Sequence, residues 1–297
     1  MIIISQQVLV QRQKTIFAAL SFCMAKKALK QLKEAVKYLQ KEYKHQPEVG
    51  IVLGSGLGNF TEEIEIEKEI DYSDIPNFPV STVEGHKGKL IFGNLSGKKI
   101  VCMGGRFHYY EGYSPEEVVF PIRVLGLLGI KTLLLSNAAG GVNPSFKVGD
   151  LMIINDHIGI DMRNPLIGKN IDELGPRFPD MSEAYKKDLV EKGKAVAANL
   201  QIEVKEGVYF CVSGPTYETP AEYKMIHIIG GDAVGMSTVQ ENIVANHMGI
   251  PVFAMSVITD LGFGHEHGKI THEEVLHYAK AAEPKLAAIF KELVAVL

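Results

Sequence analysis

The sequence predicts an α/β fold with a mostly parallel or mixed sheet, contained in a single domain. Short runs of valine, isoleucine and leucine lack the polar alternation of half-exposed strands, which is typical of strands buried on both faces. Each run is followed by small residues and then by a helical pattern, an order that indicates an α/β chain. No linker rich in proline, glycine or serine, no charge block and no internal repeat divides the 297 residues.

The first predicted element is an amphipathic helix between Lys26 and Tyr43, because apolar residues recur there every three or four positions. The next run, Val49–Leu53, predicts a strand that ends in a glycine cluster. Three later runs predict strands that lead into small-residue turns or helix starts: Thr132–Leu135 before Asn137–Gly141, Val208–Val212 before Ser213–Pro215, and Val252–Ile258 before Thr259–Asp260.

Four helix starts are predicted by the capping-box pattern, in which serine or threonine precedes glutamate by three positions. These segments are Ser114–Glu117, Thr219–Glu222, Thr238–Glu241 and Thr271–Glu274. Glu218, Ser237 and His272 are direct neighbours of three of these caps. We therefore expect them at strand-to-helix junctions, where open α/β sheets bind ligands.

Composition narrows the class of protein. Hydrophobic residues make up 46% and charged residues 22%, and the formal net charge is -4. This is typical of a soluble globular protein, and scattered lysines and arginines disfavour a nucleic-acid surface. The three cysteines are widely spaced, which disfavours a zinc site or disulfide framework and favours a reducing cytoplasm. No apolar run approaches the roughly 20 residues of a membrane helix. We expect a cytoplasmic protein without metal, membrane or nucleic-acid partners.

The N-terminus is interpreted as an appendage to the fold. Residues 1–23 are expected to be an extension or an upstream start, with the folded domain over residues 24–297. A secreted protein is the alternative, because Thr15–Ala25 has about the length of a signal-peptide core. Against it, apolar residues precede the basic Arg12 and Lys14, and several glutamines dilute the segment.

Two segments could carry chemistry. Gly54-Ser55-Gly56-Leu57-Gly58 matches neither a dinucleotide fingerprint nor a P-loop, so it predicts either a tight turn or an anion loop. Arg106–Gly112 combines a guanidinium, an imidazole, phenols and a carboxylate within a few positions. The planar fork of Arg106 matches phosphate, although a surface ion pair is the structural alternative. His86 lies in a loop flanked by glycines.

Several motifs in order resemble the trimeric purine nucleoside phosphorylases: Gly54–Gly58, Gly85-His86, Gly105–Gly112, Asn137–Gly141, Gly214–Glu222 and Gly235–Thr238. The likeness runs from about Lys26 to the C-terminus. It implies a central mixed, partly barrel-like sheet flanked by helices. It also implies phosphorolysis of inosine, guanosine and their 2′-deoxy forms to free purine and pentose 1-phosphate, by a homotrimer in purine salvage. Inorganic phosphate is then a co-substrate, and neither a metal nor another cofactor is implied.

The resemblance also assigns roles to individual residues. Phosphate would be held by Ser55, His86, Arg106, Phe107, His108, the backbone at Ala138, and Ser237. The nucleoside would contact Tyr110, Tyr217, Glu218, Met236, Asp260 and His272. The expected catalytic residues are His108, Glu111, Glu218 and Asp260, with Glu111 orienting the phosphate side and Glu218 binding N1–H of a 6-oxopurine.

Two positions depart from the family pattern. Asp260 stands where 6-oxopurine enzymes have asparagine, and an ionised carboxylate cannot donate to N7. Asp260 is therefore either protonated when it faces N7, or it receives the amine of a 6-aminopurine nucleoside such as adenosine or methylthioadenosine. Glu218 favours the 6-oxopurine interpretation. The segment Asp156–Pro165 is short, and Ile160 or Met162 stands nearest to the aromatic residue that a neighbouring subunit usually supplies.

Three functions from different classes are compared. A phosphorylase is favoured over a non-catalytic binder because the anion-binding and base-binding residues all occur. A nucleosidase using water is disfavoured by Arg106 and Ser237, which predict an anion site.

Overall fold

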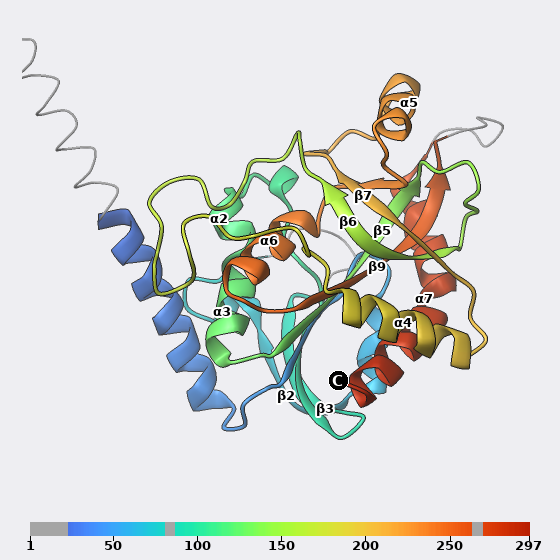
Figure 1. Cartoon of the computed structure of the whole chain (residues 1–297). Helices are drawn as coiled ribbons and strands as arrows, with labels where there is room; N and C mark the ends of the chain where they lie inside the picture. Colours follow the sequence, from blue (N-terminus) through green and yellow to red (C-terminus); the bar gives the residue numbers. More distant parts are fainter. Residues whose placement is uncertain (1–22, 81–86, 263–269) are drawn as a thin grey trace, which may run out of the picture.

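The computed structural model describes residues 23–80, 87–262 and 270–297 (Figure 1). His86 and residues 1–22 of the expected extension lie outside the described residues. Nine strands form one mixed sheet in the order β2-β3-β4-β1-β5-β8-β7-β6-β9 within this part of the chain. Their bounds are β1 Val49–Val52, β2 Glu65–Asp71, β3 Lys89–Leu95, β4 Lys98–Met103, β5 Thr132–Gly141, β6 Leu151–Ile158, β7 Val204–Cys211, β8 Ala233–Gly235 and β9 Val252–Leu261.

The sheet closes on itself at one end. Strand β5 pairs with β9 as well as with β1 and β8, so β5, β8, β7, β6 and β9 form a ring of five strands. Strand β1 runs parallel to β4 and β5, and β5 runs parallel to β9. The outer strands β2, β3 and β4 pair antiparallel. The expected mixed, partly barrel-like sheet is therefore confirmed.

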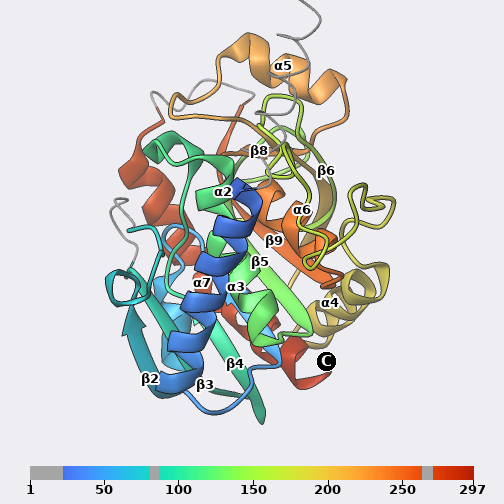
Figure 2. The same cartoon turned by 90° about the vertical axis from the view of Figure 1, so that its left-hand side faces the viewer.

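Helices cover both sides of the sheet (Figures 1 and 2). A helix over residues 23–42 confirms the predicted amphipathic helix, and it buries Leu32, Ala35 and Leu39. It lies with α2 and α3 on one side, whereas α4 and α7 pack together on the other. The bounds are α2 Pro115–Val118, α3 Phe120–Leu128, α4 Lys187–Asn199, α5 Pro220–Ile228, α6 Val239–His247 and α7 His272–Ala295, with short 3-10 helices η1 Gly58–Glu63, η2 Tyr72–Asp74 and η3 Tyr109–Glu111.

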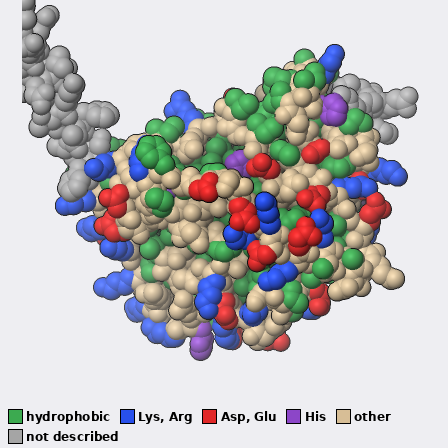
Figure 3. Space-filling model, viewed as in Figure 1, with side chains coloured by type: hydrophobic (Ala, Val, Ile, Leu, Met, Phe, Trp, Pro, Cys, Tyr) green, Lys and Arg blue, Asp and Glu red, His purple; other side chains and the backbone are tan. Residues whose placement is uncertain are grey.

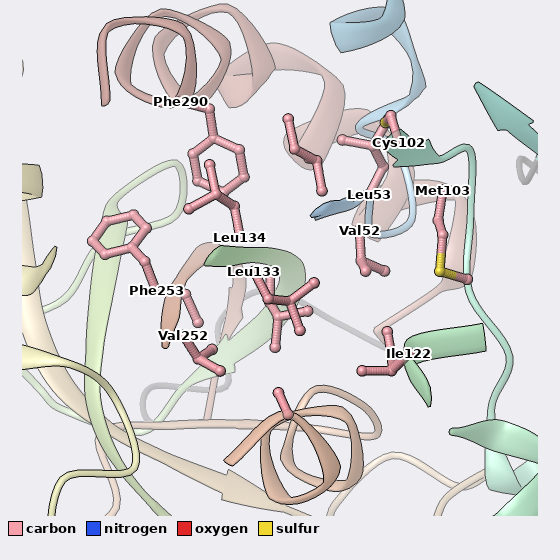
Figure 4. Close-up of a cluster of buried hydrophobic side chains, with 14 of the residues drawn as sticks. Val52, Leu53, Cys102, Met103, Ile122, Leu133, Leu134, Val252, Phe253 and Phe290 are labelled. Carbon is pink, nitrogen blue, oxygen red and sulfur yellow. The ribbon is translucent and has the colours of Figure 1, made fainter. Parts of the chain in front are cut away.

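The core lies between the central strands and their covering helices (Figure 4). Ile51, Leu134 and Phe253 have no exposed surface, as the uninterrupted apolar runs predicted. The rings of Phe253 and Phe290 meet edge to face at 6.1 Å, which ties α7 to β9. This packing fixes the carboxyl ends of β1, β4, β5 and β9 at one edge of the sheet.

Two kinds of local prediction are wrong: the turns expected after two strands, and one of the four capping boxes. Asn137–Gly141 is not a turn but the second half of β5, and β9 likewise continues through Asp260. The two strands pair along these segments, with a register shift between Ala139 and Gly140. Pairing supplies the backbone hydrogen bonds that small-residue composition alone did not reveal.

The second correction concerns a helix start. Ser114, Thr219 and Thr271 each accept a hydrogen bond from the backbone N–H three residues on, so three capping boxes are confirmed. Thr238 makes no such bond, and its backbone has a φ of 71°. Its hydroxyl instead accepts a hydrogen bond from Nδ2 of Asn137 at 2.8 Å. The threonine is used to join β5 to the start of α6.

No helix in the described ranges is long and apolar enough to cross a membrane. On the face shown in Figure 3, basic and acidic side chains are interspersed.

Candidate active site

A cavity of about 440 Å³ opens at the carboxyl ends of β1, β4, β5 and β9. Loops and helix starts that follow these strands contribute its walls, as expected for an open α/β sheet. It brings together most of the residues predicted from sequence: Ser55, Arg106, His108, Tyr110, Ala138, Tyr217, Glu218, Met236, Ser237, Asp260 and His272. Residues from seven separate chain segments thus converge on one site.

Phe107 is not among the lining residues. Its ring is buried and packs against Tyr72 and Tyr113. The side chain therefore anchors the loop after β4, and only its backbone remains as a contact for an anion. Glu111 reaches the site indirectly, through His108.

The glycine cluster after β1 is shaped by packing. A Cβ atom on Gly54 would lie 2.7 Å from the Cα atom of Asn137, so only glycine allows the loop to approach β5 this closely. The Gly54 N–H donates to Oγ of Ser136 at 3.2 Å. This close approach carries Ser55 to the wall formed by Ala138, so the structural turn and the anion loop are the same feature.

Arg106 is the buried cation of the site, with 1% of its surface exposed. Its Nε donates to Oε1 of Glu241 at 3.0 Å and its Nη2 to Oε2 at 2.8 Å, while Nη1 donates to the carbonyl of Ser136. The guanidinium is thus locked by a bidentate pair, a geometry that carboxylates favour. Sequence reasoning missed Glu241 because it fitted a capping box. The available signal was that apolar Val244 and Ala245, three and four positions further on, share its face of the helix.

His108 is buried beside Arg106. Its Nδ1 lies 3.1 Å from Oε1 of Glu111, and its ring stacks on Tyr110 with centroids 4.7 Å apart. A carboxylate only accepts hydrogen bonds, so Nδ1 carries the proton and Nε2 carries the lone pair in the neutral ring. Burial lowers the pKa of His108, opposed by the hydrogen bond to Glu111. The neutral form is favoured near pH 7.

We call Ser55, Arg106, His108, Ala138 and Ser237 the anion cluster. The other end of the cavity holds two carboxyl groups, Glu218 and Asp260. Burial raises the pKa of both, and the charge of Asp260 raises that of Glu218 further. Oδ2 of Asp260 accepts a hydrogen bond from the Tyr223 hydroxyl at 3.0 Å, and Oδ1 accepts one from Thr259 at 3.0 Å. We call Glu218, Tyr223 and Asp260 the carboxyl cluster.

The remaining predicted residues complete the walls. Tyr217 is 39% exposed at the mouth, Met236 follows β8, and His272 opens α7. Met162 lines a separate cavity of about 530 Å³, and Ile160 is exposed. Neither residue lines the first cavity of its own chain.

The cavity at the strand ends thus combines a buried arginine and histidine with two carboxyl groups, an arrangement consistent with the phosphorylase expected from sequence. Residues 48–295 match the family model of the phosphorylase superfamily. The chain is 51% identical over 263 residues to purine nucleoside phosphorylase 1 of Geobacillus stearothermophilus, covering 89% of this chain and 96% of that protein. It is 48% identical to the rat enzyme, over 84% of this chain and 89% of that protein.

Solved structures give the same result. The purine nucleoside phosphorylase of Schistosoma mansoni in complex with inosine has a TM-score of 0.84 at 42% identity, covering 90% of this chain and 96% of that one. Its complex with adenosine has a TM-score of 0.85 at 44% identity, with the same coverage. The chain therefore belongs to the phosphorylase superfamily, among its purine nucleoside phosphorylases. The class of enzyme expected from sequence, a pentosyltransferase, is confirmed.

Proposed function

We propose that the chain cleaves inosine, guanosine and their 2′-deoxy forms with inorganic phosphate, releasing free purine and pentose 1-phosphate for purine salvage. The observation that carries this proposal is that one cavity is lined by the anion cluster and by both carboxyl groups, Glu218 and Asp260. The Schistosoma mansoni structures with hypoxanthine and inosine bound support a 6-oxopurine substrate, and Glu218, which can accept N1–H, favours it over adenosine or methylthioadenosine. No cofactor takes part, because phosphate and protein groups supply the charge.

On the phosphate side, the side chains of Ser55, Arg106 and Ser237 and the backbone at Ala138 hold the anion. Glu241 and the Ser136 carbonyl fix the guanidinium before phosphate arrives, so little orientation has to be lost on binding. Nε2 of neutral His108 accepts the proton that phosphate carries at neutral pH, and Glu111 stabilises the resulting imidazolium through Nδ1. His86 is proposed to join this group on the family resemblance alone.

The reaction is a displacement at C1′. As the bond from C1′ to N9 breaks, its electron pair moves into the purine and a phosphate oxygen forms the new bond to C1′. Asp260, in its protonated form, gives its proton to N7, so the purine leaves as a neutral molecule. The proton taken by His108 returns to Asp260 through solvent after the products leave, which restores the enzyme. Donors aimed at the developing negative charge lower the barrier most effectively.

The nucleoside is oriented by the other lining residues. Glu218 accepts N1–H of the 6-oxopurine, and Tyr217 lies beside the base. Tyr110 and Met236 contact the ribose, and His272 reaches the 5′-hydroxyl. Raised pKa values at Glu218 and Asp260 support one charged and one neutral carboxyl in this region.

The deciding experiment measures hypoxanthine and ribose 1-phosphate released from inosine with and without phosphate. We expect equal amounts of both products and no release without phosphate. Equal release without phosphate would indicate a nucleosidase, and no release from any purine nucleoside would indicate a binding protein. Faster cleavage of adenosine than of inosine would overturn the base assignment. Arg106→Met should abolish the phosphate-dependent release of hypoxanthine, and Lys131→Met, which removes a surface charge, should not.

We also propose that residues 24–297 form the enzyme as a cytoplasmic homotrimer. The helix over residues 23–42 packs into the core, which supports a domain boundary close to its start. Exposed Met225 and Ile228 on α5 support a subunit contact near the cavity. Removal of residues 1–23 should leave activity unchanged, and sedimentation should give three times the chain mass. A monomer with full activity would reject the trimer.

A further inference from the structure

Tyr223 is a buried residue of α5 to which neither sequence nor resemblance assigned a role. Its side chain is 1% exposed, and its hydroxyl donates to Oδ2 of Asp260 at 3.0 Å. The same hydroxyl lowers the pKa of the neighbouring Glu218 carboxyl, toward which it acts as a donor. One phenol therefore bonds Asp260 directly and acts on Glu218, the two groups that are proposed to bind the purine.

The fold keeps space for this phenol. A Cβ atom on Gly140 of β5 would lie 2.7 Å from the Tyr223 hydroxyl oxygen and 2.8 Å from Oδ2 of Asp260. A Cβ atom on Gly262, after β9, would lie 1.9 Å from Cδ1 of the ring. Glycines on two different segments thus form the slot that holds the ring and hydroxyl, so the position of the hydroxyl is specified by the sheet as well as by α5.

The chemistry of the cluster limits its charge. Two partly buried carboxyl groups that line the same cavity do not ionise independently, and the first charge raises the proton affinity of the second. The Tyr223 hydroxyl has a single proton to donate, so it stabilises one carboxylate at a time. Among the described residues, the other titratable groups that act on the cluster are Tyr217 before α5, Glu222 on α5 and Glu274 on α7, with His272 in the same cavity.

We propose that Tyr223 is a positioning residue that holds Glu218 and Asp260 as a coupled pair carrying one negative charge. The cavity then offers one acceptor and one donor to the base, which matches N1–H and N7 of a 6-oxopurine. When Asp260 gives its proton to N7, the hydroxyls of Tyr223 and Thr259 stabilise the carboxylate that remains. This inference rests on the proposed phosphorolysis. It names Tyr223 as the group that controls the protonation of Asp260, the proposed acid.

The test compares pH profiles of kcat/KM for inosine between wild type and Tyr223→Phe at saturating phosphate. The acid limb reports the first of the two carboxyls to ionise and the alkaline limb reports the second, because the pair must carry one negative charge. Loss of the hydroxyl removes a donor from both carboxylates, so both limbs should move to higher pH, by about one unit. The maximal rate should fall about tenfold. Inosine and phosphate titrate identically with both enzymes, so the displacement belongs to the protein.

Tyr185→Phe is the matched control, because it removes a buried tyrosine hydroxyl whose partner is His157. Neither limb should move in this variant. Unmoved limbs in Tyr223→Phe, with wild type active, would overturn the inference and leave the proposed function intact. Absence of phosphate-dependent cleavage in wild type would instead overturn the proposed function.

Asp260→Asn keeps the test decisive if Tyr223→Phe does not fold. It removes one carboxyl from the pair with little change of shape. Only one limb, that of Glu218, should remain, because the variant has one carboxyl in place of two. Two limbs in this variant would show that the second limb belongs to another group, and the inference would be rejected.

Discussion

Substitution of Glu241 by glutamine tests the role of the buried pair with Arg106. The pair is bidentate, at 3.0 and 2.8 Å, and the side chains of Arg106 and Glu241 are 1% and 3% exposed. Glutamine has nearly the same shape but presents an amide with donors of its own. The guanidinium would then remain charged and buried without its carboxylate.

The expected loss of stability in Glu241→Gln follows from the burial of the pair. Removing one partner of a buried ion pair costs about 3–5 kcal/mol, because the other charge is left uncompensated. At about 2–4 °C per kcal/mol for a domain of this size, Tm should fall by about 6–20 °C. A surface pair gives a matched control. Glu48 and Lys131 are 3.8 Å apart with exposed side chains, so Glu48→Gln should cost less than about 1 kcal/mol.

The assay is thermal unfolding of wild type, Glu241→Gln and Glu48→Gln in buffer free of phosphate, repeated with added phosphate. Phosphate should raise Tm more in Glu241→Gln than in wild type, because the anion is then the main counter-charge of Arg106. Equal Tm values for the three proteins without phosphate would refute the reasoning. So would destabilisation of Glu241→Gln with no added protection by phosphate, since the loss would then be unrelated to the anion site.

Three further outcomes follow from the site. Asp260→Asn should keep activity on inosine within about tenfold of wild type at pH 7, because an amide donates to N7 without titrating. It should also lower the rate of adenosine cleavage relative to inosine cleavage, and an increased ratio in a substrate panel would contradict this. Gly140→Ala should lower the free energy of unfolding measured in urea by about 1–3 kcal/mol and reduce kcat/KM, because the added methyl group would contact Tyr223 and Asp260. Unchanged values would show that Gly140 does not make room for Tyr223. Burial lowers the pKa of His108, so the unfolded chain binds more protons and stability should fall as pH drops below about 6.5. His108→Gln should flatten that decline, and parallel curves for the two proteins would exclude His108 as its source.

Much of the fold was predictable because its signals are local. Apolar runs such as Val49–Leu53 report burial on both faces, and the serine and threonine caps report a hydrogen bond made within one turn. The site residues at strand ends were accessible for the same reason, since a strand followed by a helix start already defines a position at the carboxyl edge. The helix between Lys26 and Tyr43 was found within a few residues of its observed bounds.

The failures share a long-range cause. Thr238 and Glu241 have the spacing of a cap, but their partners Asn137 and Arg106 lie more than 100 positions away. Asn137–Gly141 has the composition of a turn, but pairing with β9 extends it as a strand. Local pattern states which hydrogen bonds a segment can make. It does not state which partner the fold brings within reach.

The two groups of side chains in the cavity carry charges of opposite sign. At the anion cluster, the positive charge of Arg106 is already balanced by Glu241, and His108 is favoured in its neutral form. Among these three side chains there is no excess positive charge, so we expect phosphate to be held by the direction of the Arg106 N–H donors, without trapping the phosphate ester that forms. At the carboxyl cluster, Tyr223 lets two acids share one charge. Before the reaction, each end of the cavity therefore carries little uncompensated charge. The oriented groups then stabilise mainly the charge that develops as the bond breaks.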